Sequence, residues 1–314
     1  MNQVTPIKNQ FTDDFVADCA RVSFGKDASQ YTPEQNANLI NYLIRENHIN
    51  PAFHGKHSIE VASNEYLEKK LLKEKCLLAG LDLFSNDDDN TWIITGSQFG
   101  LLELARHFQC GELLNTIREK SPVLTDAYTK YNNFHNDDKS HELQIIDFNA
   151  DTPYCHEPFT FKFKTTLDVK NQLYTHCVGM AKSSESHRYI KALEYFTPEF
   201  RGKADNVKQG SSDAIVKENH YNLPIQVNDA RGEKIMFDIP ILYIDLVKMT
   251  NGWYDANEHV ANECRRAANL QSTAIQYYIT GSREAWERVV WLRDTPHAQK
   301  EVRQLMTTIK ETLK

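Results

Sequence analysis

The sequence predicts an α+β fold, because strand-like and helix-like patterns occur in separate, well-marked stretches. Phe159, Phe161 and Phe163 alternate with polar residues, which is the two-residue period of a strand with one buried face. Residues 93–106 and 279–293 each predict a strand, a Thr-Gly-Ser turn and a helix, in the same order. We interpret this echo as a local structure used twice, since two short matches do not make a repeat protein.

Further signals along the chain complete the expected secondary structure. Residues 32–44 begin with a Thr-Pro-x-Gln capping box and continue with apolar residues at helical spacing. Asp255 predicts the cap of a helix that runs to about Ala268, and a last helix is expected from Pro296 onward. The apolar stretch 237–249 is expected to be buried.

The composition describes a chain that can bury a sizeable core and has no excess of positive charge. It has 314 residues, of which 40% are hydrophobic and 25% charged, with a net charge of −7. That balance argues against a general nucleic-acid binder, whose affinity depends on many Lys and Arg contacts to phosphates. Any phosphate site is therefore expected to be local and built from a few placed arginines.

Neither the cysteines nor the first residues predict export or a membrane. The six cysteines are scattered and include no Cys-x-x-Cys pair, which is neither a disulfide framework nor a zinc pattern. The first residues lack a secretory signal, and no apolar run approaches the roughly 20 residues that span a bilayer. We therefore expect a cytoplasmic protein without a membrane or nucleic-acid partner.

Residues 183–191, with the sequence SSESHRYIK, concentrate hydroxyl and charged groups in one place. Nothing in this stretch suits a buried core, whereas serine and arginine side chains are suited to a phosphorylated ligand. The Thr-Gly-Ser turn at 280–282 is a second candidate anion site, because a helix start exposes free N–H groups. Most such turns only cap helices, and both interpretations stay open.

Arginines and a histidine of the C-terminal region are candidates for binding the same anion. Arg266, Arg283, Arg288 and Arg293 lie in the two helical stretches that flank the predicted strand. Arg293 closes the apolar face of its helix, where an arginine often binds a carboxylate or phosphate through two hydrogen bonds. His297 follows at a helix start, which favours a neutral imidazole, although a capping or surface role fits equally.

The Cys–His pairs at 155–156 and 176–177 do not predict a metal site. Zinc uses such ligands, but adjacent residues on a strand point to opposite faces, so neither pair easily supplies two of them. The deaminase, dinucleotide-binding and P-loop signatures are absent as well. We expect no metal ion, and no activated nucleophile at Cys155.

Four stretches together resemble the flavin-dependent thymidylate synthases. The signature of that family is a glutamine, Arg-His-Arg three residues later, and then S-x-N-E-x-S-x-R-Y. The stretches 172–177 and 183–189 match this signature when one residue is deleted. The matching positions are Gln172, His176, Glu185, Ser186, Arg188 and Tyr189.

The C-terminal block gives the most specific match. Family members carry an arginine, then a T-G-N-x-R-A-W-like turn and helix, then L-R-x-x-x-H-A-Q-x-E-I-R. This chain has Arg266, then TGSREAW, then LRDTPHAQKEVR at 292–303.

The N-terminal stretch ARVSFGK (20–26) is similar to the family's A-A-R-V-S stretch. The family's histidine–proline segment has two echoes here, HINPAFH (48–54) and TPYCHEPFTF (152–161). Which of the two lies beside the folate is left open.

The resemblance implies a fold and a domain organisation. The implied fold is α+β, with a mixed, largely antiparallel sheet flanked by helices, and members of the family are homotetramers with sites shared between subunits. The family core would occupy residues 1–57 and 152–314. An insertion at 58–151, whose role the sequence does not indicate, would interrupt it.

The resemblance also implies the activity. Family members transfer a methylene group from methylenetetrahydrofolate and a hydride from reduced FAD to deoxyuridine monophosphate (dUMP), and NADPH regenerates the flavin. The positions expected to bind dUMP are Gln172, Glu185, Ser186, Arg188, Tyr189, Arg266 and Arg293, of which Ser186 and Arg293 are expected to act in catalysis. The positions expected along the cofactors are His48, Thr152, His176, Ser282, Arg288 and His297.

Several positions depart from the family pattern. Thr175 and Cys177 replace both arginines of Arg-His-Arg, which normally contact flavin and nucleotide phosphates. Arg283 and Lys182 are the candidates to replace their charge. Two other functions stay open: an enzyme that modifies another pyrimidine nucleotide, for example by hydroxymethylation, and an inactive nucleotide-binding paralogue.

Overall fold

The computed structural model describes residues 2–64, 67, 80–86, 90–132, 134, 143–191, 194–203, 211–217, 220–296 and 298–314. Its helices are α1 (Asp13–Arg21), α2 (Pro33–Arg45), α4 (Gln98–His107), α5 (Gly111–Lys120), α6 (Pro122–Tyr131), α7 (Leu167–His176), α8 (Tyr243–Ala256), α9 (Asn262–Arg265), α10 (Arg283–Arg293) and α11 (Lys300–Thr312). Its strands are β1 (Gln3–Ile7), β2 (Lys56–Ala62), β3 (Leu81–Asn86), β4 (Thr91–Ser97), β5 (Ile145–Asp147), β6 (Pro158–Thr166), β7 (Ala181–Ser184), β8 (Arg201–Lys203), β9 (Ser211–Ile215), β10 (Tyr221–Asn228), β11 (Lys234–Ile241) and β12 (Ala274–Ser282).

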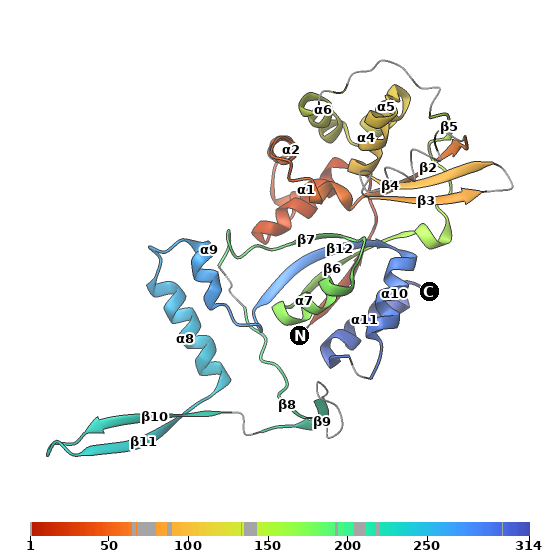
Figure 1. Ribbon diagram of the computed structural model, residues 1–314. Coiled ribbons are helices and arrows are strands. Elements are labelled where there is room, and N and C mark those ends of the chain that lie inside the picture. Colours follow the sequence, from red (N-terminus) through yellow and green to blue (C-terminus); the bar gives the residue numbers. More distant parts are fainter. Residues whose placement is uncertain are drawn as a thin grey trace.

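Two four-stranded sheets form the body of the protein (Figure 1). The C-terminal sheet has the strand order β1-β6-β12-β7, and the N-terminal sheet has the order β3-β4-β2-β5. Every pairing between the described strands is antiparallel. The expected α+β fold, with largely antiparallel strands flanked by helices, is therefore confirmed, and it contains two such sheets where one was expected.

The C-terminal sheet packs against α7, α10 and α11 around a core of aromatic rings. Phe161, Phe163 and Trp286 are fully buried there, and the rings of Phe161 and Trp286 lie 4.9 Å apart. The Trp286 indole donates a hydrogen bond to the Phe159 carbonyl (3.0 Å). The alternation that predicted this strand is thus the alternation of its buried face.

The N-terminal sheet has a separate core, which it shares with α1, α2, α4, α5 and α6. The predicted helix at 32–44 is confirmed as α2, with the Gln35 N–H donating to Thr32 Oγ1 (3.2 Å). Strand β2 begins at Lys56, so the expected insertion at 58–151 would start inside a strand. The core of the N-terminal sheet also includes residues that precede position 58, such as Val16 and Ile40. The division into 1–57, 58–151 and 152–314 remains a prediction.

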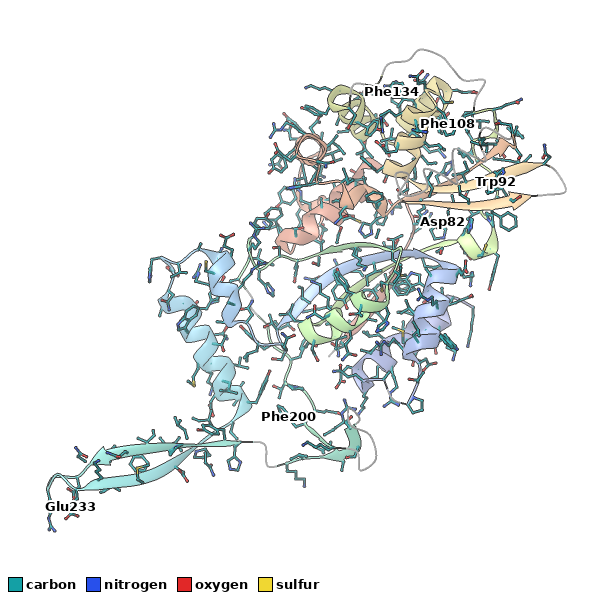
Figure 2. The ribbon with its side chains drawn as sticks, viewed as in Figure 1. Asp82, Trp92, Phe108, Phe134, Phe200 and Glu233 are labelled. Carbon is teal, nitrogen blue, oxygen red and sulfur yellow. The ribbon has the colours of Figure 1, made fainter. Side chains whose placement is uncertain are left out.

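Two expectations about the region 221–268 are wrong. Strands β10 and β11 form a hairpin that projects from the body, with Glu233 near its tip (Figure 2). The stretch 237–249 is therefore not buried as a whole, and Phe237 is 44% exposed. The helix expected to start at Asp255 starts earlier, because the carboxylate of Asp245 caps the N–H of Leu242 (3.0 Å), and α8 ends at Ala256.

Candidate functional site

A cavity of about 710 Å³ lies where three distant stretches of the chain meet. Its walls come from the end of α1 and the short helix η1 (Val22–Phe24), from the end of α2 and η3 (Asn50–Phe53), and from β7 with Tyr189. Ten of the fifteen lining residues lie within 20–26, 48–54 and 183–189, which carry the family resemblance in the sequence, and the other five come from α2 and from Asn47 and Lys182. The lining residues are Ala20, Ser23, Phe24, Leu39, Tyr42, Leu43, Asn47, His48, Ile49, Asn50, Pro51, Lys182, Ser183, Ser184 and Tyr189.

Gly25 lets the first of these stretches come close to the third. Its φ of 65° lies in the left-handed region, which disfavours any residue with a side chain. A Cβ at this position would lie 3.2 Å from Glu185 Oε1 and 3.3 Å from Ile190 Cδ1. The glycine therefore ends η1 and leaves room for the 183–191 stretch.

Hydrogen bonds hold the start of the polar stretch against β12. The Ser186 N–H donates to the Ser23 carbonyl (3.1 Å). The Glu185 carboxylate accepts hydrogen bonds from the N–H (2.8 Å) and the side-chain amide (2.9 Å) of Gln276. Burial raises the pKa of Glu185, and the hydrogen bonds from Gln276 lower it. Glu185 thus fixes the backbone of the site, and it also lines a neighbouring cavity of about 410 Å³.

Tyr189 and Arg188 remain accessible to a ligand. The Tyr189 ring stacks on Phe24 at a centroid distance of 4.8 Å and an interplanar angle of 24°, and Tyr189 is 53% exposed. Two stacked rings give a wall on which a planar base can pack. Arg188 pairs with Glu263 at the surface (3.3 Å), and surface ion pairs are weak, so its guanidinium is free to turn toward a phosphate.

His54 is a residue of the site that sequence reasoning did not single out. It is fully buried, with Nδ1 2.8 Å from Thr280 Oγ1 and Nε2 3.0 Å from Ser183 Oγ. Burial lowers the pKa of His54 to about 3, so the ring is neutral. Because Ser183 lines the cavity, His54 positions part of its wall. Its place in HINPAFH was the only sequence signal.

Arg288 and Arg293 of α10 lie near His176 at the end of α7, and we call these three residues the cationic cluster after the two arginines. Burial lowers the pKa of His176, and the charges of Arg293 and Arg288 lower it further. The Nε atom of Arg293 is buried and has no hydrogen-bond partner in the described parts of the chain. These helices cover the face of the sheet that carries Tyr277, whereas the next residue, Tyr278, packs against α1. The cationic cluster therefore lies on the opposite face of the sheet from the cavity.

The predicted site residues are only partly brought together. His48 and Tyr189 line the same cavity, and Arg266 lies beside Arg188, since its Nε donates to the Glu263 carbonyl (3.2 Å). Three others have structural partners. Gln172 donates to Gln299, and Thr152 shares a hydrogen bond with Ser58 (2.8 Å). Ser282 caps α10 by accepting a hydrogen bond from the Ala285 N–H (3.4 Å). His297 lies outside the described residues.

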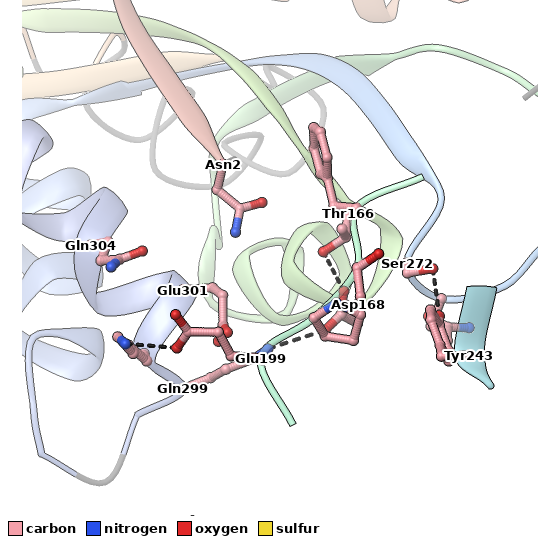
Figure 3. A pocket seen from close by; sticks show the side chains of 14 residues that line it. Asn2, Thr166, Asp168, Glu199, Tyr243, Ser272, Gln299, Glu301 and Gln304 are labelled. Atoms are coloured by element: carbon pink, nitrogen blue, oxygen red, sulfur yellow. Dashed lines mark hydrogen bonds and ion pairs between the residues drawn. The ribbon is translucent and has the colours of Figure 1, made fainter. Parts of the chain in front are cut away.

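Another cavity, of about 360 Å³, is lined by acidic side chains (Figure 3). Asp168, Glu199 and Glu301 face it among mostly neutral residues. Glu199 is paired with Lys300 (2.7 Å) and Glu301 with Arg201 (3.0 Å), so Asp168 carries the remaining negative charge. Carboxylates at such a surface repel phosphate groups. This cavity is therefore not the candidate nucleotide site.

The cysteines near the site show no sign of activation. Cys177 is buried, and burial raises the pKa of its thiol to about 12. Among the residues that the structure describes, no group of three or more His, Cys, Asp or Glu side chains is arranged to hold a metal ion. No helix in the same ranges is long and apolar enough to span a membrane.

The fold and the cavity define an α+β protein with a candidate ligand cavity beside a pair of stacked aromatic rings. A family model described as Thy1, thymidylate synthase complementing protein, matches residues 116–314. The chain belongs to this family, and its resemblance to the flavin-dependent thymidylate synthases is confirmed.

One relative is the flavin-dependent thymidylate synthase of Aquifex aeolicus (strain VF5). It is 23% identical over 330 aligned residues, which cover 96% of this chain and 93% of the relative. Two solved structures of the UMP/dUMP methylase PolB from Streptomyces cacaoi are similar to this chain. The structure bound with 5-Br dUMP is 14% identical to it, and the structure bound with 5-Br UMP is 13% identical. These likenesses cover 99% of this chain and 89% and 88% of the other chains, and both have a TM-score of 0.36. At that score they carry no weight for the site.

Proposed function

We propose that the chain is a flavin-dependent thymidylate synthase that methylates dUMP to thymidylate, with methylenetetrahydrofolate as one-carbon donor and reduced FAD as hydride donor. The observation that carries this proposal is the convergence of residues 20–26, 48–54 and 183–189 on one cavity. NADPH is the proposed electron source for the flavin, and the cytoplasm the proposed compartment.

The cavity beside β7 is the proposed dUMP site. Its volume of about 710 Å³ is of the size that small-molecule ligands occupy. Tyr189 and Phe24 offer a stacking surface for the uracil ring. The hydroxyl of Ser186 and the guanidinium of Arg188 supply donors for a phosphate or a carbonyl.

The part of the protein in the reaction is to bind the base and polarise it. Hydrogen-bond donors at the uracil carbonyls make C5 of the base more nucleophilic, so no protein nucleophile is required. FAD, when bound, supplies the hydride. We assign the donor role to Ser186 of this chain and to Arg293 of a second chain, since Arg293 lies on the opposite face of the sheet from the cavity. The raised pKa of Cys177 agrees with a reaction that uses no thiolate.

The cationic cluster fits the phosphate groups of FAD. His176, Arg288 and Arg293 lie together, and the unpartnered Nε of Arg293 is a donor without an acceptor among the described residues. Because this cluster and the cavity lie on opposite faces of one sheet, we propose that a second chain completes the site, as in the sites shared between subunits that the resemblance implies.

Of the two candidates to replace the lost arginine charge, only Lys182 borders the cavity. Arg283 is buried and paired with Glu157, so it serves the fold. Lys182 borders the cavity, but its ammonium group donates to the Tyr174 carbonyl of α7 (3.1 Å), on the other face of the sheet. Thr175 supplies no charge, and its hydroxyl donates to the Asn171 carbonyl (2.8 Å).

The test is the visible absorption spectrum of the purified chain, before and after addition of FAD and dUMP. The proposal predicts flavin bands that shift when dUMP binds, followed by thymidylate in a product assay with methylenetetrahydrofolate. A different one-carbon product would favour the related-enzyme alternative. A protein that binds dUMP but never takes up FAD would be an inactive paralogue, which the neutral residues Thr175 and Cys177 favour.

A further inference from the structure

The two four-stranded sheets have the same construction. The C-terminal sheet runs β1-β6-β12-β7, and the N-terminal sheet, taken from its other edge, runs β5-β2-β4-β3. In each sheet a short edge strand is followed by three strands whose order along the chain is first, last and middle: β6, β12 and β7 in one sheet, β2, β4 and β3 in the other. Strands β8 to β11 lie between β7 and β12 in the chain but outside this sheet. A helix follows the third strand at once, α10 after β12 and α4 after β4. We name residues 50–132 the N-terminal unit and residues 152–314 the C-terminal unit.

The register of the central strands is identical. Thr95, Gly96 and Ser97 pair with residues 58, 57 and 56, while Thr280, Gly281 and Ser282 pair with residues 160, 159 and 158. The central hydroxyl groups form matching buried hydrogen bonds. Ser58 Oγ lies 2.8 Å from Thr95 Oγ1, and Thr160 Oγ1 lies 2.7 Å from Thr280 Oγ1.

The helix starts repeat the same details. Ser97 and Ser282 each accept a hydrogen bond from the backbone N–H three residues later, at 3.0 and 3.4 Å. The N–H that follows each serine donates to the residue just before the first strand: Gln98 to the Gly55 carbonyl (3.1 Å), and Arg283 to the Glu157 carbonyl (2.8 Å). Such agreement in backbone bonding goes well beyond a shared Thr-Gly-Ser turn.

The entries to the outer strands match as well. Gly80 (φ 88°) lies two residues before Asp82, which pairs with Thr95. Gly179 (φ 73°) lies two residues before Ala181, which pairs with Thr280. Both glycines line one cavity of about 320 Å³ between the units. The segments before the first strands share Pro-x-x-His, as Pro51 to His54 and Pro153 to His156.

The contacts between the units are reciprocal. His54 of the N-terminal unit bonds Ser183 on β7 (3.0 Å), and His156 of the C-terminal unit meets the ring of Phe84 on β3 (6.1 Å between centroids). Ser183 and Phe84 occupy the same register position in their sheets. Each sheet also takes its edge strand from outside the two units, since β1 (residues 3–7) pairs with β6 and β5 (residues 145–147) pairs with β2. Reciprocal contacts of this kind define a two-fold interface between two copies.

We propose that the chain is an internal duplication, in which the N-terminal unit is a second copy of the fold that has no nucleotide site and serves as a built-in partner of the C-terminal unit. The stretch 58–151 is then the larger part of this copy and not an insertion. The C-terminal unit connects its outer and central strands by residues 185–273, which include Glu185, Ser186 and Tyr189. The N-terminal unit makes the same connection with residues 87–90 alone. One chain therefore has one site, which is positioned across the interface by His54.

This inference rests on the proposed function for the identity of the ligand, and two matched variants of the full chain test it. Thr95→Val and Thr280→Val each remove one buried hydroxyl at equivalent positions and keep the side-chain shape. Both should lower Tm by a similar amount, about 2–4 °C. Thr280→Val should also weaken dUMP binding about fivefold, because it releases His54 beside Ser183, whereas Thr95→Val should leave the affinity unchanged. Calorimetric titration of the wild-type chain should give one dUMP per chain.

Each contrary result has a definite meaning. Two dUMP molecules per chain would overturn the loss of the site from the N-terminal unit, and equal weakening of binding by both variants would overturn the role of His54. A Tm loss confined to one variant would overturn the equivalence of the units. If the wild-type chain binds no dUMP at all, the proposed function fails, and the two Tm shifts alone decide whether the duplication stands.

Discussion

Replacement of His54 by glutamine should remove a large part of the acid sensitivity of the protein's stability. In the folded chain burial lowers the pKa of His54 from 6.5 to about 3. The unfolded chain therefore takes up a proton at this residue near pH 6.5, while the folded chain stays neutral. Stability from this residue is complete above pH 6.5 and is lost as the pH falls toward 3. Between pH 8 and pH 5 the loss amounts to about 2 kcal/mol.

Thermal unfolding at a series of pH values measures this effect. For a chain of 314 residues, a loss of about 2 kcal/mol corresponds to a fall in Tm of about 3 °C between pH 8 and pH 5. His54→Gln should lower Tm at pH 8, because glutamine restores the contacts to Thr280 and Ser183 incompletely, but its curve should be flatter by that amount. His220→Gln, the same substitution at an exposed histidine, is the matched control. Parallel curves for the wild type and His54→Gln would refute the buried neutral state of His54.

Three further predictions concern the site and its assembly. Tyr189→Ala should weaken dUMP binding about three- to tenfold in a titration, because the stacking surface is lost; unchanged affinity would exclude stacking on this ring. Arg293→Ala should weaken FAD binding. It should also raise the pKa of His176, observable by NMR titration, because a positive neighbour is removed; an unchanged pKa would show that Arg293 and His176 do not interact. Light scattering should give about 73 kDa, a homodimer of the 36.3 kDa chain, because two duplicated chains already contain the four copies of a family homotetramer; about 145 kDa would contradict this.

Local patterns in the sequence predicted the elements that depend on neighbouring residues. The capping box of α2, the alternating aromatic residues of β6 and the Thr-Gly-Ser helix starts all appear where they were expected. The hairpin β10–β11 was missed because its apolar residues suggested burial, whereas its side chains are largely exposed. Apolar composition alone does not tell an exposed arm from a core segment.

The long-range features could not be read from local patterns. The pairing of β1 with β6 and the meeting of His54 with Ser183 join residues more than a hundred positions apart. Motif matching found the stretches that line the cavity, because the family resemblance is strong there. It did not separate Tyr189, which lines the cavity, from Gln172, which bonds Gln299. Side-chain direction depends on the packing of elements, which periodicity does not specify.

The pairing of β1 with β6 has a consequence for synthesis of the chain. Strand β1 consists of residues 3–7, yet its partner β6 consists of residues 158–166. At about 5–20 residues per second, the ribosome needs roughly 8–30 s to make the segment between them. During that time β1 has no strand to pair with, although the cavity-lining ends of α1 and α2 have already been made. Closure of the C-terminal sheet is therefore a late step of folding that depends on the first residues of the nascent chain remaining unbound until most of the chain has emerged.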